Sequence, residues 1–173
     1  MRTWTIVLLF FVGYVLQTSL FDRVALWGVR PDIVMILVCI VALRRGPREG
    51  AISGAIAGFF VDLSGGRLIG LGAMAKAAAG ACVGWAGARV FGENALVTVG
   101  MVAVASVMEQ VIYLFGAWAF GFPFPLQESV VRVALPSLWY DSAASVVVYP
   151  LFLLLERWIG NLSSSDRPGP IHG

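Results

Sequence analysis

The chain has 173 residues, of which 59% are hydrophobic and only 13% are charged, and its mean hydropathy is +0.86. This composition lies outside the range of water-soluble domains and is typical of an integral membrane protein. The net charge of +2 comes from dispersed arginines, which argues against nucleic acid as a partner. The polar segments are too short to form a separate soluble domain, so we expect function within or against a bilayer.

Six apolar segments follow one another along the chain. The first has no small-residue cleavage site behind it, so it is expected to remain as a membrane span. About 20 helical residues cross a ~30 Å hydrocarbon core, and four of the segments reach or approach that length. The segments occupy residues 4–20, 33–43, 51–61, 69–88, 95–120 and 133–155.

The two short segments, 33–43 and 51–61, allow two arrangements. A re-entrant hairpin would place the charged turn between them in hydrocarbon, at a cost of about 2.5 to 3.5 kcal/mol per charge. Two complete spans avoid this cost if neighbouring helices shelter Asp32 and Asp62 at their ends. The sequence therefore predicts an all-α integral membrane fold, a six-transmembrane-helix bundle.

The distribution of arginines predicts the orientation of this bundle. Six spans place both termini on one side, and an inside N-terminus gives seven arginines on the cytoplasmic face against four outside. By the positive-inside rule, both termini are expected to be cytoplasmic. The densest cluster, Arg44 to Arg48, is expected to lie on anionic lipid, with contact to a cytoplasmic protein as the alternative.

The polarity of the C-terminal residues predicts the domain organisation. Residues 161–173 are polar and rich in proline and glycine, which favours a disordered cytoplasmic tail. We therefore expect a six-span membrane domain at residues 1–160 and this tail at residues 161–173.

Glycines recur every four residues in the third and fourth segments. Small residues at this spacing let the backbones of two membrane helices approach each other closely. The sequence therefore predicts that the third and fourth spans pack tightly together. The two rows are Gly46, Gly50, Gly54, Gly58 and Asp62 in one segment, and Gly72, Lys76, Gly80, Gly84 and Ala88 in the other.

Four charged residues fall inside the predicted spans: Asp62, Lys76, Glu109 and Asp141. At 1.5 Å per residue from the span ends, all four lie in the outer half of the membrane, about 9 to 12 Å deep. A charge in hydrocarbon normally faces the bundle interior beside a partner or a water-filled cavity. We expect Lys76 to pair with Glu109, and Asp32 to form the rim of the cluster.

Several roles compete for this charge cluster. It could clamp the six helices together, form an outward-facing pocket for a small solute around Lys76, or conduct a proton or ion. Enzymatic activity is not expected, because the sequence lacks HExxH and GxSxG and has no histidine to activate Ser53 or Ser106. The two cysteines have no CxxC spacing and the single histidine, His172, lies in the tail, so neither a metal nor another cofactor is expected.

Short motifs in a particular order resemble the rod shape-determining protein MreD family, over roughly residues 4–158. Pro31 suits the first turn of a helix and Asp32 suits a helix N-terminus, so this pair marks the start of the second span. The motifs are Gln17-Thr18-Ser19, Arg30-Pro31-Asp32, Gly46-Pro47-Arg48-Glu49-Gly50, the spaced residues Gly54, Gly58 and Asp62, and Gly70-Leu71-Gly72-Ala73-Met74-Ala75-Lys76.

The resemblance implies a non-enzymatic scaffold subunit of the elongasome, which maintains cell shape and inserts side-wall peptidoglycan in rod-shaped bacteria. It implies location in the bacterial cytoplasmic (inner) membrane, where membrane lipids surround the protein. The implied partners are MreC, bound through its transmembrane helix, RodA and a penicillin-binding transpeptidase through MreC, and MreB on the cytoplasmic side.

The resemblance also bears on the alternative function. The family's fold is similar to the S component of energy-coupling-factor transporters, and such a fold keeps solute binding in an outward-facing pocket around Lys76 as the alternative. Structural, partner-binding or solute-binding roles are therefore expected for Arg30, Pro31, Asp32, Gly54, Gly58, Asp62, Lys76, Glu109 and Asp141.

Overall fold

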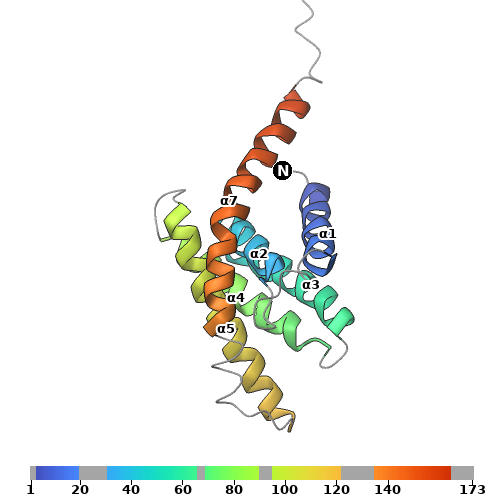
Figure 1. The fold of residues 1–173 in the computed structure, drawn as a ribbon, viewed down its shortest axis with the longest axis vertical. Helices are drawn as coiled ribbons and strands as arrows, with labels where there is room; N and C mark the ends of the chain where they lie inside the picture. The colour runs from blue at the N-terminus through green and yellow to red at the C-terminus, as the bar shows by residue number, and fades with distance from the viewer. Residues whose placement is uncertain (1–2, 20–30, 66–68, 90–94, 122–134, 165–173) are drawn as a thin grey trace, which may run out of the picture.

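The computed structural model describes residues 3–19, 31–65, 69–89, 95–121 and 135–164, which form six helices (Figure 1). Each helix overlaps one of the six predicted apolar segments. The helices are α1 (Thr3–Ser19), α2 (Ile33–Arg45), α3 (Pro47–Gly65), α4 (Leu71–Gly87), α5 (Ala95–Ala119) and α7 (Leu135–Ser164). The last helix continues beyond residue 160, and residues 165–173 of the predicted tail lie outside the described residues.

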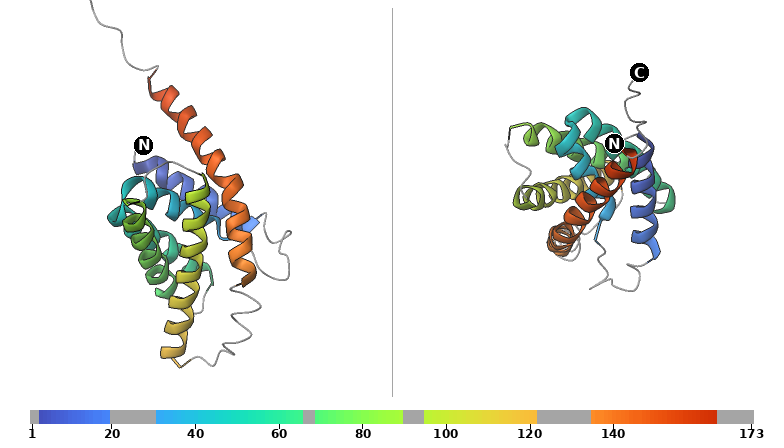
Figure 2. Two further views of the ribbon diagram at one scale, coloured as in Figure 1. Left: turned by 90° about the vertical axis from the view of Figure 1, so that its left-hand side faces the viewer. Right: turned by 90° about the horizontal axis from the view of Figure 1, so that it is seen from above.

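The second helix, α2, lies at the centre of the bundle and contacts all five of the other helices (Figures 1 and 2). Residues 33–42 of α2 are all buried. A helix that is hydrophobic on every side is expected where other helices cover each of its faces. Its 13 residues rise only about 20 Å, so it is shorter than a hydrocarbon core. The short, unbroken apolar run of the second segment is therefore that of an interior helix.

Helices α3 and α4 pack against each other in opposite directions along their whole length. Gly50 faces Gly80, whereas Gly58 faces Ala73 nearer the connection between the two helices. A Cβ added to Gly58 would lie 2.6 Å from the Cα of Ala73, closer than real Cβ atoms come to other atoms. The predicted tight packing of the third and fourth segments is confirmed, because the glycine rows bring the two backbones together.

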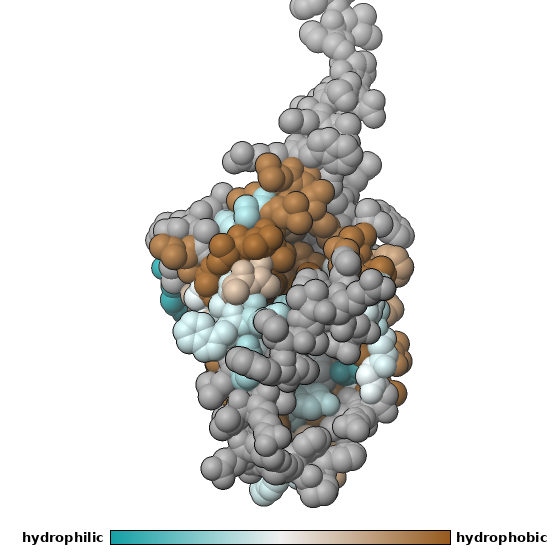
Figure 3. Space-filling model, in the orientation of Figure 1, coloured by the Kyte–Doolittle hydropathy of each residue, from teal (hydrophilic) through white to brown (hydrophobic). Residues whose placement is uncertain are grey.

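Some charged side chains are buried and many large apolar side chains are exposed, which is unusual for a water-soluble protein. Lys76 and Asp141 are only 1% and 3% exposed, whereas Leu96 and Trp139 are 78% and 79% exposed. Hydrophobic side chains also cover much of the described surface near α7 (Figure 3). A soluble protein buries apolar groups and exposes charges, so this distribution fits an apolar solvent around the helices.

Helices α5 and α7 lie side by side at one edge of the bundle (Figure 2). Among the described residues, their segments Leu96–Ala119 and Pro136–Leu155 are long and apolar enough to cross a membrane. Only 22% of the most apolar stretch of each segment is buried, unlike the core helices of soluble proteins. A shorter apolar segment, Leu9–Ser19, belongs to α1.

Candidate functional site

The side chain of Lys76 is the centre of a charged contact between three helices. Its Nζ lies 2.6 Å from Oε1 of Glu109 on α5, and it also forms an ion pair with Oδ2 of Asp32 ahead of α2. Lys76 itself projects from α4 and is buried. The predicted pairing of Lys76 with Glu109 is therefore confirmed, and Asp32 is a second direct partner rather than the rim of the cluster.

The carboxylate of Asp32 also begins α2. Its Oδ1 accepts a hydrogen bond of 2.9 Å from the backbone N–H of Met35, which is the geometry of a helix N-cap. Pro31 lies buried just before it, and Arg30 lies outside the described residues. One carboxylate thus starts the central helix with one oxygen and binds Lys76 with the other.

Backbone amides at the start of α2 are satisfied by side chains from two distant helices. The N–H of Asp32 donates to Oδ1 of Asp141 on α7 at 2.7 Å, and the N–H of Val34 donates to Oε1 of Gln17 on α1 at 3.1 Å. The first amides of any helix have no partner within the helix, and leaving them unpaired away from water is costly. Because α2 begins inside the bundle, α1 and α7 supply these acceptors.

Asp141 links α7 to α5 as well as to α2. Its Oδ2 accepts a hydrogen bond of 2.7 Å from the hydroxyl of Ser106, and both residues are buried. Ser106 lies three residues before Glu109, so both fall on the same face of α5. The sequence contains this spacing, but it does not by itself predict that Ser106 bonds to Asp141.

The contacts described above connect five residues into one cluster, which we call the polar core. Four helices, α2, α4, α5 and α7, meet around it. Within the described part of the chain, every buried polar side-chain atom has a hydrogen-bond partner. Lys76 has two carboxylate partners and Asp141 accepts two hydrogen bonds, and such pairing is the condition under which buried polar and charged groups are tolerated. The members of the polar core are Asp32, Lys76, Ser106, Glu109 and Asp141.

Asp62 does not join the polar core, contrary to the expectation from its depth. Its Oδ2 accepts hydrogen bonds from the backbone N–H groups of Gly70 at 2.8 Å and Ala73 at 3.1 Å, at the start of α4. The N-cap of α4 is Gly70, which has no side chain to act as acceptor. Asp62 therefore caps α4 from the neighbouring helix. The four-residue spacing between Asp62 and the glycines before it does not predict this role.

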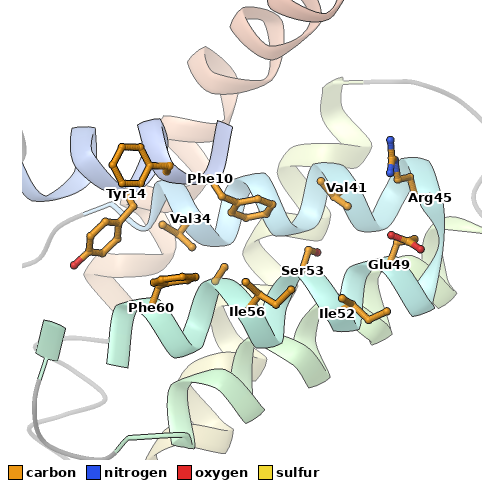
Figure 4. A pocket seen from close by; sticks show the side chains of 12 residues that line it. Phe10, Tyr14, Val34, Val41, Arg45, Glu49, Ile52, Ser53, Ile56 and Phe60 are labelled. Atoms are coloured by element: carbon orange, nitrogen blue, oxygen red, sulfur yellow. The ribbon is translucent and has the colours of Figure 1, made fainter. Parts of the chain in front are cut away.

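A second feature is an apolar groove of about 280 Å³ between α1, α2 and α3 (Figure 4). Its walls are mostly aromatic and aliphatic side chains, with Arg45 and Glu49 together at one end (Figure 4). This groove was not predicted, because it depends on the angle between helices that are separate in the sequence. Its lining residues are Phe10, Phe11, Tyr14, Val34, Val41, Arg45, Glu49, Ile52, Ser53, Ile56, Ala57 and Phe60.

Comparison with known proteins gives one match. A family model described as rod shape-determining protein MreD matches residues 1–159, which include five of the six described helices and most of α7. No curated protein and no solved structure matches the chain. MreD proteins are membrane proteins, in agreement with the exposed apolar helices, and the family's role is in determining rod shape. The chain belongs to the rod shape-determining protein MreD family.

Proposed function

We propose that this protein is a non-enzymatic scaffold subunit of the elongasome, which holds the side-wall peptidoglycan synthase together by binding the transmembrane helix of MreC. The family match over residues 1–159 carries this proposal. RodA and the penicillin-binding transpeptidase are reached through MreC, and MreB lies on the cytoplasmic side. The protein has six membrane spans in the bacterial inner membrane, with both termini in the cytoplasm.

The exposed arginines support this orientation. Arg44, Arg45 and Arg48 are exposed at the turn between α2 and α3, where a charged group has to reach the lipid headgroups or water. The charge of Lys76, in contrast, is inside the bundle and has partners there. One end of the bundle thus carries the positive charge that is typical of a cytoplasmic face.

The contacts of the polar core support a structural role in preference to a solute pocket. Lys76 is 1% exposed and both carboxylates nearest its Nζ bind it directly. A pocket for an anionic solute would require the ammonium to face an accessible cavity, as buried cations of transporters do. The polar core instead joins α2, α4, α5 and α7, which gives the scaffold a fixed arrangement of helices.

Co-purification tests the scaffold function. The tagged protein and MreC are co-expressed, extracted in mild detergent and captured through the tag, with an unrelated single-span protein as the control. We expect MreC to be retained and the control to be lost. Retention of neither protein would contradict the scaffold function.

Cysteine cross-linking locates the helix face that binds MreC. Cys82 is exposed and is replaced by serine, whereas Cys39 is buried and remains. Single cysteines then replace exposed apolar residues on separate helices, namely Val111 on α5, Val147 on α7 and Ile56 on α3. A scaffold interface predicts cross-linking to the MreC helix from one face only. Equal yields from all three positions would indicate random collision in the membrane.

A further inference from the structure

The apolar groove described above has a charged end at Arg45 and an aromatic end at Tyr14 and Phe60. Beside the aromatic end, the hydroxyl of Tyr14 on α1 donates a hydrogen bond to the hydroxyl of Ser64 on α3, so that these side chains bridge the two helices. Helix α2 forms the floor between them, through Val34 and Val41 (Figure 4). The groove therefore does not continue past the Tyr14–Ser64 bridge.

The opposite end of the groove is charged. Arg45 and Glu49 line it there, and both side chains are exposed (Figure 4). Arg48 is exposed in the same turn without lining the groove, so positive charge exceeds negative charge at this end of the bundle. A phosphate group is the natural anion for arginine, whose planar guanidinium presents several donors to it.

The length of the groove decides between two classes of occupant. From Val34 to Arg45 the floor helix rises about 16 Å, close to the ~15 Å that one leaflet contributes to a ~30 Å hydrocarbon core. A partner's transmembrane helix needs the full thickness and would collide with the Tyr14–Ser64 bridge. A single hydrocarbon chain that enters from the arginine end fits the available length.

We propose that this groove is a phospholipid-binding site, in which one acyl chain lies between α1 and α3 and the phosphate of the headgroup contacts Arg45. The lipid comes from the leaflet on the side of the α2–α3 turn. The apolar walls bind the chain, and the Tyr14–Ser64 bridge sets where the chain ends. The site is separate from the polar core, and it is independent of the proposed binding of MreC.

Native mass spectrometry in detergent tests the site. Purified protein is delipidated and then mixed with palmitoyl-oleoyl phosphatidylglycerol or phosphatidylethanolamine at equal concentration. We expect one phospholipid to be retained per protein at low lipid concentration. Arg45→Ala should lower the retained fraction about threefold, the size expected for the loss of one exposed charge pair, whereas Arg48→Ala, outside the groove, should not.

A second pair of variants tests the chain-binding part of the groove. Ser53→Phe fills the groove from α3, and Val104→Phe adds comparable apolar volume on the exposed face of α5. We expect Ser53→Phe to abolish retention and Val104→Phe to leave it unchanged. If Ser53→Phe does not fold, Ile52→Trp at the exposed rim takes its place.

Three results would overturn the proposal. The first is that the wild-type protein retains no lipid of either kind. The second is that a folded groove-filling variant retains as much lipid as wild type. The third is that a Ser53→Cys variant cross-links efficiently to a co-expressed single-span protein, because the groove would then hold a protein helix.

Discussion

The backbone N–H of Asp32 donates a 2.7 Å hydrogen bond to the carboxylate of Asp141, which lies 109 residues further along the chain. This contact joins the first turn of the central helix to the last described helix. Because the same carboxylate also binds Ser106, the side chain of Asp141 connects α2, α5 and α7. The polar core therefore gives direct predictions for stability.

Asp141→Ala is expected to lower the free energy of unfolding by about 2 to 6 kcal/mol, because one buried and one partly buried donor lose their acceptor at about 1 to 3 kcal/mol each. Ser106→Ala removes only one hydrogen bond and should cost about 1 kcal/mol. Asp141→Asn keeps an oxygen acceptor and should lie between the two. Thermal unfolding in detergent measures the order of stability of the three variants. Equal melting temperatures for Asp141→Ala and Asp141→Asn would contradict the acceptor role of this side chain.

Lys76→Ala is expected to destabilise the protein by about 3 to 5 kcal/mol, because it leaves two carboxylates near each other without their cation. Replacing all three charges, as Lys76→Met with Glu109→Leu and Asp32→Asn, should restore much of this loss, since buried ion clusters can be exchanged for uncharged packing. Asparagine is chosen at position 32 because it retains the N-cap oxygen for Met35.

The comparison between single and triple variants separates the two roles of Lys76. A structural clamp predicts recovery of the melting temperature in the triple variant, together with recovery of rod shape in cells. A ligand-binding lysine predicts recovered folding without recovered shape. The unchanged fold of the triple variant is checked by circular dichroism.

Gly58→Ala is expected to cost about 1 to 3 kcal/mol, because the new Cβ meets the Cα of Ala73 and α3 has to move away from α4. Gly100→Ala is the matched control, since an added Cβ there meets nothing within 4 Å. Removing a helical glycine at an open position should raise stability by up to about 1 kcal/mol. Similar melting temperatures for the two variants would contradict close packing through the glycine row.

Asp62→Ala is expected to loosen the start of α4, because the amides of Gly70 and Ala73 lose their acceptor. The cost should be about 0.5 to 2 kcal/mol, as for other helix N-caps. Hydrogen exchange measured by mass spectrometry should be faster at residues 70–73 and unchanged within α5. Unchanged exchange at residues 70–73 would show that Asp62 is not their cap.

The sequence predicts the helices well because their signals are local. Long apolar segments, the turn RRGPREG and the helix-start signal of Pro31 and Asp32 each depend on neighbouring residues only. The close packing of α3 and α4 was also predictable, since its signal repeats along both segments. The pairing of Lys76 with Glu109 followed from a similar physical constraint, because a lysine inside a membrane requires a partner.

Other contacts depend on the relative placement of helices, and the sequence does not determine that placement by any local pattern. Depth alone assigned Asp62 to the cluster around Lys76, whereas the short connection to α4 brings Asp62 to the first amides of that helix instead. The contact of Gln17 with Val34 had no signal beyond its polar type. No sequence pattern predicted the apolar groove, because each of its walls resembles an ordinary lipid-facing helix.

The three charged residues that meet at Lys76 are made in a fixed order during translation. Asp32 is synthesised before Lys76, whereas Glu109 follows 33 residues later. At about 5 to 20 residues per second, that interval lasts about 2 to 7 s. Asp32 is therefore the first partner of Lys76 to be present in the growing chain. The order of the helices in the sequence supplies Lys76 with a counterion before the second carboxylate, on α5, has been synthesised.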